Sequence, residues 1–158
     1  MFTNTILSQQ YLDNGQLSRS QDYLQNHIAA SVAFKSAKKR GVWRRLRAWL
    51  TRRSVQLRHY PTTGMQYGKH AARGVQYIAI DQIIGSEGRS HDFDNQFWPI
   101  SEHSRERWVS IAMAMGTDKP LPPVQLVQTA NGYVVRDGNH RVSVARAYGH
   151  TTVEAEII

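Results

Sequence analysis

Five consecutive residues near the C-terminus, Asp137-Gly138-Asn139-His140-Arg141, have the composition and the setting of an anion-binding turn. They follow a β-type run, Tyr133 to Arg136, and precede a helix-type run, Val142 to Tyr148. The first backbone N–H groups of a helix lack partners within the helix, and the helix dipole places positive charge at the same end. We therefore expect the N–H groups of Asn139 to Arg141 to face a phosphate group.

The side chains of the turn can add to this interaction. Gly138 permits the turn, and His140 and Arg141 can donate hydrogen bonds to the anion. Asp137 either holds the turn in shape or positions a Mg²⁺ ion through water. The alternative is an ordinary helix start, in which Asp137 or Asn139 caps the helix and Arg141 is a surface residue.

The composition excludes several classes of chemistry. The chain has 158 residues, enough for one domain with an appendage, and it contains no cysteine. Disulfides, thiolate metal sites and cysteine nucleophiles are therefore excluded. Residues 1–13 lack the pattern of a secretory signal, and no apolar run approaches the roughly 20 residues of a membrane span. We expect a cytoplasmic protein.

The positive charge is concentrated in the first part of the chain. Residues 1–60 hold 11 Lys and Arg against 2 acidic residues, whereas residues 61–158 hold 9 against 10. Ten of the basic residues lie between Lys35 and Arg58, with no acidic residue among them. The asymmetry predicts a basic extension with a linker, residues 1–74, and a near-neutral domain, residues 75–158.

The basic extension reads as two helices. Ser20 to Arg40 is the first, Gly41 marks a break, and Val42 to Leu57 is an amphipathic second helix. Its apolar stripe is expected to pack against the domain through Val42, Leu46 and Leu50, with Trp49 on the same side. Pro61 to Gly74 reads as a linker.

The exposed cations of this extension, residues 35–58, predict contact with nucleic acid, whose backbone binds cationic side chains through counterion release. Trp43 and Trp49 suit the same partner. An anionic membrane surface is a weaker alternative, and a merely solvated basic face is another. The residues expected to contact nucleic acid are Lys38, Lys39, Arg40, Arg44, Arg45, Arg47, Arg52 and Arg53.

From residue 75 onward, periodicity and turn signals predict the order β-α-β-β-α-β, a small α+β sheet domain. Asn131-Gly132 reads as a hairpin turn. The other expected elements are a strand from Tyr77 to Ile80 running into Asp81 to Ile84, a helix from Glu102 to Met115, strands from Val124 to Gln128 and Tyr133 to Arg136, and a closing strand from Val153 to Ile157.

This order, with Asp-Gly-x-His-Arg on the last strand-to-helix turn, resembles the ParB/sulfiredoxin superfamily. The resemblance covers about residues 75–158, and its motifs are Ile80-Asp81-Gln82-Ile83 before Gly85-Ser86-Glu87-Gly88-Arg89, then Leu121-Pro122-Pro123-Val124, then Tyr133 to Arg146. It implies a mixed sheet and a nucleotide at the last turn, ATP, ADP or CTP, with or without Mg²⁺. Arg89 could reach the phosphate from the facing loop, or it could pair with Asp81 or Asp92.

The branches of this superfamily imply different activities. Sulfiredoxins have a cysteine where this chain has Asn139, so repair of sulfinic acids through a thiol is excluded. Partition ParB proteins carry a Glu-Arg-Arg type motif at this turn and a helix-turn-helix domain after it, and this chain ends at Ile158. The resemblance to free-serine kinases implies Glu87 as a base that takes a proton from a substrate hydroxyl.

The sequence therefore predicts a ParB-like protein that binds a nucleotide or phosphate and associates with nucleic acid. The alternatives are a small-molecule phosphotransferase or nucleotide hydrolase and a protein-interaction module without turnover. A homodimer is compatible with each. His91, Asp92 and Asp94 form a further candidate cluster for a divalent ion, although an ordinary surface loop, with Asp92 capping locally, is the favoured explanation because the cluster lacks the spacing of a dedicated metal site.

Overall fold

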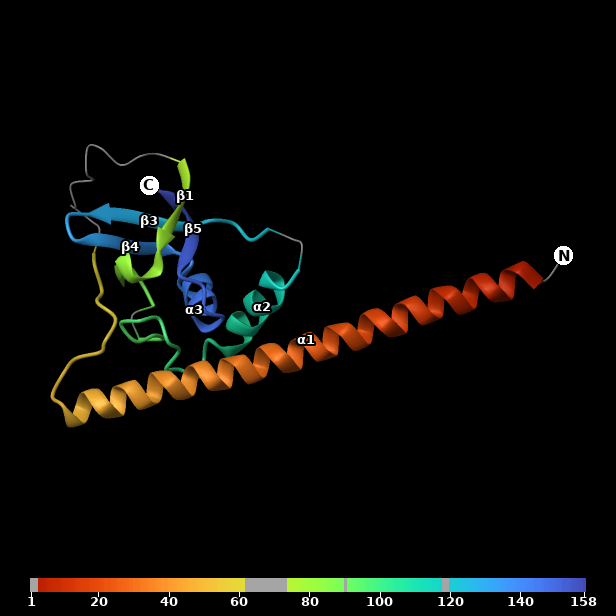
Figure 1. Ribbon diagram of the computed structural model, residues 1–158, viewed down its shortest axis with the longest axis horizontal. Helices are drawn as coiled ribbons and strands as arrows, with labels where there is room; N and C mark the ends of the chain where they lie inside the picture. The colour runs from red at the N-terminus through yellow and green to blue at the C-terminus, as the bar shows by residue number, and fades with distance from the viewer. Residues whose placement is uncertain (1–2, 62–73, 90, 118–119) are drawn as a thin grey trace.

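The computed structural model describes residues 3–61, 74–89, 91–117 and 120–158, with side chains from Arg19 onward. It contains a long N-terminal helix, α1 (Thr3–Leu50), and an α+β domain with a five-stranded mixed sheet (Figure 1). The predicted fold class is confirmed. Among the described residues, no helix is both long enough and apolar enough to cross a membrane.

The sheet has the order β1-β5-β3-β4-β2. β1 and β5 are antiparallel, as are β3 and β4, whereas β3 and β5 are parallel, as are β2 and β4. The elements after α1 are β1 (Gly74–Ala79), β2 (Ile83–Ser86), α2 (Arg105–Met115), β3 (Val124–Thr129), β4 (Gly132–Asp137), α3 (Asn139–Ala147) and β5 (Thr152–Ile157).

The region predicted as a strand from Tyr77 to Ile80, running into Asp81 to Ile84, contains two strands. A 3₁₀ turn, Ile80–Gln82, separates β1 from β2, and these two strands lie at opposite edges of the sheet. The short turn carries the chain from one edge to the other. Such a crossing is a tertiary feature, so an unbroken apolar run such as Tyr77 to Ile80 could not reveal it.

Three helical layers cover the sheet. α3 contacts β3 and β5, α2 packs against α3, and α1 packs across α2 (Figure 1). The core joins all of them, because Phe34 of α1 meets Trp108 of α2 edge-on with a ring-centroid distance of 5.5 Å. Trp108 in turn donates from Nε1 to Ser143 Oγ of α3 over 2.9 Å. Both aromatic side chains are fully buried.

The side of α1 that faces the domain consists mainly of small residues. Their spacing follows the helical period, so they form one stripe along the helix. The stripe contains Ala30, Phe34, Ala37, Gly41 and Ala48, all buried.

Two predictions about this helix are wrong. The helix does not break at Gly41, and Val42, Leu46 and Leu50 do not pack against the domain, because all three are exposed. The helix continues through Gly41, where the missing side chain allows α1 to lie close to the backbone of the domain. A Cβ atom there would lie only 2.7 Å from the carbonyl oxygen of Pro99.

Gly41→Ala is therefore expected to destabilise the protein by about 1 kcal/mol or more, although alanine is the better helix former. The clash is with backbone, which cannot rotate away. Urea unfolding would measure the change, with Gly88→Ala as control because nothing among the described residues lies within 4 Å of a Cβ at Gly88. A Gly41→Ala protein more stable than the parent would contradict this close contact.

α1 ends at Leu50, not at Leu57 as predicted. Arg52 adopts a left-handed conformation with φ +53°, and the Arg53 N–H donates to Ala48 O over 2.8 Å. This is a Schellman ending with arginine in the position that glycine usually occupies, so the usual sequence signal is absent. The chain then runs beside β2, where Ser86 N–H donates to Arg58 O over 3.0 Å. Most of the predicted linker lies outside the described residues.

Candidate anion-binding site at the N-terminus of α3

The predicted turn between β4 and α3 is present. Gly138 precedes the helix in a left-handed conformation with φ +107°, and no side chain caps the helix at that position. A Cβ atom at Gly138 would lie 3.1 Å from both Val124 methyl groups, so glycine is required here for conformation and for space. Within the described part of the chain, the N–H groups of Asn139, His140 and Arg141 have no hydrogen-bond partner.

His140 lies inside the protein beside this turn. Its side chain is only 5% exposed, and its ring meets Phe93 edge-on at 5.1 Å. The pKa of His140 is lowered to about 4, first by burial and then by the charges of Arg107 and Arg89, against the opposite influence of Asp92 and Asp137. The imidazole is therefore neutral at neutral pH and has one N–H to donate.

Two buried polar atoms of this first turn lack partners among the described residues. They are the Oδ1 atom of Asn139 and the Nε2 atom of His140. Buried polar atoms in native proteins are nearly always hydrogen-bonded to protein, water or a ligand. Their presence at an uncapped helix start marks this turn as a place where a ligand or bound water completes the structure.

Arg141 is already engaged within the protein. Its guanidinium donates to the carbonyl oxygens of Pro122 and Pro123, the latter at 2.6 Å, and to Asp137 Oδ2 at 2.5 Å. The side chain is 13% exposed. These contacts brace the turn against the segment before β3. The predicted phosphate contact of Arg141 stays a prediction, and it requires the guanidinium to exchange at least one of these acceptors.

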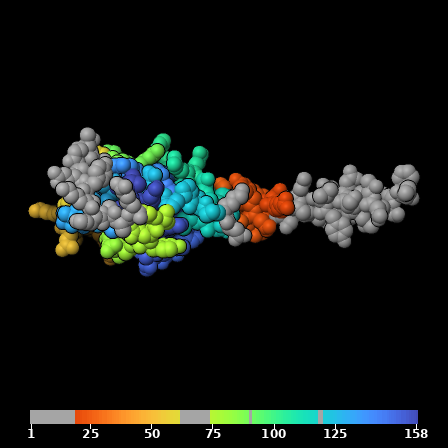
Figure 2. Space-filling model, turned by 90° about the horizontal axis from the view of Figure 1, so that it is seen from above, coloured from red at the N-terminus to blue at the C-terminus, as the bar shows by residue number. Residues whose placement is uncertain are grey.

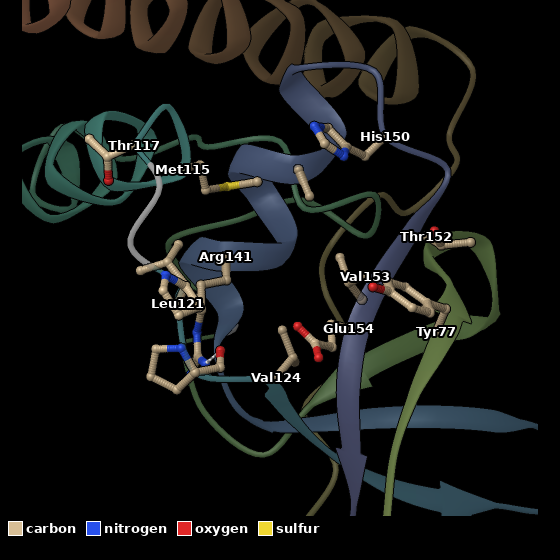
Figure 3. A pocket seen from close by; sticks show the side chains of 13 residues that line it. Tyr77, Met115, Thr117, Leu121, Val124, Arg141, His150, Thr152, Val153 and Glu154 are labelled. Atoms are coloured by element: carbon tan, nitrogen blue, oxygen red, sulfur yellow. Dashed lines mark hydrogen bonds between the residues drawn. The ribbon is translucent and has the colours of Figure 1, made fainter.

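Arg141 also borders a pocket of about 380 Å³ between α3, β5 and the end of α2 (Figure 3). Leu121, Val124 and Val153 supply apolar walls, and Glu154 is a polar group at its border. The pocket runs along the side of α3. Neither Asn139 nor His140 lines it, so Arg141 is the one residue that the pocket shares with the three free N–H groups.

Two arginines from other parts of the chain lower the pKa of His140 through their positive charge. Arg89 follows β2, is half-exposed, and lies 3.5 Å from Asp92, the partner that the sequence offered as one alternative. Asp81, the other alternative, pairs with Arg146 at 2.7 Å. Arg107 on α2 is exposed and has no ion-pair partner among the described residues. Sequence reasoning missed Arg107, because a lone arginine near a helix start carries no motif.

Glu87 directly follows β2, two residues before Arg89, but its carboxylate is not free. The Nε atom of Arg136 donates to Oε1 at 3.0 Å and to Oε2 at 3.1 Å. Its role as a base stays a prediction, and it requires release from Arg136.

The carboxylate of Asp94 has a structural role. It is fully buried and accepts hydrogen bonds from Arg44 Nε at 2.7 Å and from the backbone N–H groups of Gln96 and Trp98, both at 2.9 Å. Asp94 is therefore not available to share an ion with His91 and Asp92. Across the described ranges, no group of three His, Asp or Glu side chains is placed to hold a metal ion.

The basic residues predicted to bind nucleic acid divide into two sets. Lys38 pairs with Glu102 at 2.5 Å, Arg44 pairs with Asp94, and Arg40 lies over the Trp98 ring at 5.2 Å. These three fasten α1 to the domain. The remaining five are exposed to solvent, namely Lys39, Arg45, Arg47, Arg52 and Arg53.

Comparison with known proteins gives one structural likeness. No protein-family model matches the chain, and no curated protein matches it. The crystal structure of sulfiredoxin from Arabidopsis thaliana is similar to 54% of this chain and 84% of its own, with 10% sequence identity and a TM-score of 0.42. This likeness concerns the arrangement of the backbone and says nothing about a ligand.

Proposed function

We propose that this protein binds a phosphate-bearing ligand, a nucleotide, at the N-terminus of α3. The observation that carries the proposal is an uncapped helix start with two buried polar atoms that lack partners among the described residues, Asn139 Oδ1 and His140 Nε2, where the positive charges of Arg107 and Arg89 also act on His140. The helix supplies free N–H donors and the positive end of its dipole, while the guanidinium groups supply charge from two other elements. An anion would satisfy all of these groups at once.

Each residue has a defined part in this proposal. The N–H groups of Asn139 to Arg141 donate to phosphate oxygens, and His140 donates from one ring nitrogen. Arg89 and Arg107 supply positive charge near His140. Asp137 is 61% exposed in its side chain and can hold a Mg²⁺ ion through water, which would offset charge on the phosphates. ATP, ADP and CTP all fit this chemistry, because the contacts are to phosphate.

Binding without turnover is the form that the contacts favour. A base must reach the proton that it removes, whereas Glu87 is held at both oxygens by Arg136. Phosphotransfer or hydrolysis would require this pair to open.

Arg107→Gln is expected to weaken binding of ATP or ADP by about tenfold, since a hydrogen bond to a charged group contributes about 1.5 kcal/mol. Arg89→Gln should have a similar effect. Isothermal titration calorimetry would measure both. Arg105→Gln is the matched control. Arg105 lies on the same helix as Arg107 and its side chain is also substantially exposed, with its Nε atom 3.8 Å from Glu102 Oε1.

Two results would overturn the proposal. One is a parent protein whose melting temperature is unchanged by ATP, ADP, CTP and pyrophosphate, each with and without Mg²⁺, because a ligand that binds the folded state must raise it. The other is an Arg89→Gln/Arg107→Gln protein that binds nucleotide as tightly as the parent.

A further inference from the structure

The side of α1 that faces away from the domain is apolar. Its large side chains are exposed in the region that packs on the domain, and Trp49 is 75% exposed. The others there are Val42, Trp43, Leu46 and Leu50. Leu24, Ile28 and Val32 continue the exposed stripe toward the N-terminus.

This outer stripe lies opposite the buried one. Leu46 is two residues from Ala48, which places the two side chains about 160° apart around the helix. Figure 1 shows the sheet, α2 and α3 all on one side of α1. Figure 2, viewed from that side, shows the domain over the C-terminal part of the helix, with the orange segment around residue 25 extending beyond it. The outer stripe is therefore left without a partner within the described chain.

Cations border this stripe. Lys35 and Lys39 lie within it, Arg45 and Arg47 flank it, and all four are exposed without an ion-pair partner in the described part of the chain. Arg52 and Arg53 follow directly, and no acidic residue occurs anywhere from Tyr23 to Ile80. The surface is thus both apolar and strongly positive.

A depression beside the stripe extends the same surface. It has a volume of about 550 Å³ and lies between α1 and Trp98 of the domain. Trp43, Leu46 and Leu50 border it together with Arg40, Arg44 and Arg47. Indole rings and arginine side chains are the groups that favour the boundary between lipid headgroups and acyl chains.

We propose that the outer face of α1 binds the surface of an anionic lipid bilayer. The helix lies in the plane of the interface, with Leu46, Trp49 and Leu50 in the boundary region. The flanking lysines and arginines contact lipid phosphates, and the domain stays on the aqueous side. This surface is separate from the α3 site, so the proposal stands independently of nucleotide binding.

Charge and apolarity together favour lipid over two other partners. Nucleic-acid phosphates would attract the arginines but would leave the aliphatic side chains exposed to water. A second copy of the chain would bring Lys35 and Lys39 close to positive charges on the other stripe, which is unfavourable. An anionic bilayer satisfies both the cations and the apolar side chains.

Vesicle flotation tests the proposal with the full chain. Vesicles of equal parts phosphatidylglycerol and phosphatidylcholine are expected to carry the protein, whereas pure phosphatidylcholine vesicles should carry far less. Tryptophan emission should shift to shorter wavelength on binding. Trp98 and Trp108 are already buried, so the shift reports on Trp43 and Trp49.

Two double variants separate the apolar and the charged contributions. Leu46→Gln/Leu50→Gln is expected to lower partitioning at least about tenfold through lost apolar burial. Arg45→Gln/Arg47→Gln should lower it roughly thirtyfold at low salt, at about 1 kcal/mol for each charge. Tyr77→Gln is the control, because Tyr77 is an aromatic side chain of the domain with the same 75% exposure as Trp49. Circular dichroism would confirm that every variant is folded.

Three outcomes would overturn the proposal. The first is equal partitioning of the parent and the Leu46→Gln/Leu50→Gln variant. In the second, the parent does not bind vesicles but binds duplex DNA, and the Leu46→Gln/Leu50→Gln variant still binds this DNA. In the third, the parent does not bind vesicles but forms dimers, whereas the variant is monomeric.

Discussion

Asp94→Ala is expected to lower the free energy of unfolding by about 3–5 kcal/mol, the usual cost of removing one partner from a buried ion pair. The Asp94 side chain is 0% exposed, and its loss leaves Arg44 without its carboxylate. It also leaves the Gln96 and Trp98 N–H groups without their acceptor. Each of these losses carries a desolvation penalty.

The same substitution also removes the support of a strained loop. Phe97 adopts a left-handed conformation with φ +60°, which is unfavourable for an aromatic residue. Asp94 accepts hydrogen bonds from the backbone N–H groups of the two residues that flank Phe97. The Arg44 contact, in turn, links this loop to α1. We therefore expect the loop and the docking of α1 to weaken together.

Urea unfolding would measure this loss. Asp94→Asn should cost less than Asp94→Ala, because an amide oxygen still accepts from the backbone. Asp92→Ala is the control, since the Asp92 carboxylate makes one long contact, 3.5 Å to Arg89, and its loss should cost clearly less than that of Asp94. An Asp94→Ala protein as stable as the Asp92→Ala protein would refute the structural role of Asp94.

Acidification from about pH 6.5 to about pH 4 is expected to destabilise the protein by about 3 kcal/mol through His140 alone. The pKa of His140 is lowered from 6.5 to about 4 in the folded state, mainly by burial. Within this pH window the unfolded chain therefore binds the proton more readily than the folded chain. The stabilisation is complete above the unfolded pKa and is lost progressively as the pH falls toward 4.

The pH dependence of stability, measured by urea unfolding at several pH values, is the readout. His140→Gln should flatten the profile between pH 6.5 and pH 4, whatever its effect at neutral pH. His150→Gln is the control, because His150 is exposed. If the His140→Gln profile is as steep as that of the parent, His140 is not the group responsible.

The sequence predicted the sheet domain better than the helix before it. The prediction of β5 was correct because apolar and acidic residues alternate there, and one face of the strand is buried while the other is exposed. The apolar residues are Val153, Ala155 and Ile157. The orientation of α1 was predicted wrongly. Large apolar residues usually mark the buried side of a helix, but here Ala37, Gly41 and Ala48 face the domain. Small residues carry little periodic hydrophobic signal, although they permit the closest packing.

The candidate site was predictable as a turn but not as a set of contacts. Gly138 follows from local chemistry, since the turn requires a positive φ. The contacts of the site's side chains involve residues far away in the chain. Arg141 donates to the carbonyl groups of Pro122 and Pro123, and Glu87 accepts from Arg136. No local pattern encodes such contacts. The burial of His140 against Phe93 likewise requires the folded loop after β2.

The Phe34–Trp108 contact determines which truncations and substitutions of this protein can be interpreted in functional terms. Phe34 belongs to α1, yet it fills the space beside a tryptophan at the centre of the domain. A shortened chain that begins after α1 would expose that tryptophan to water, and its loss of activity would report on misfolding rather than on function. Point substitutions on the outer face of α1 avoid this ambiguity. Mutational tolerance should therefore differ sharply between the two sides of a single helix.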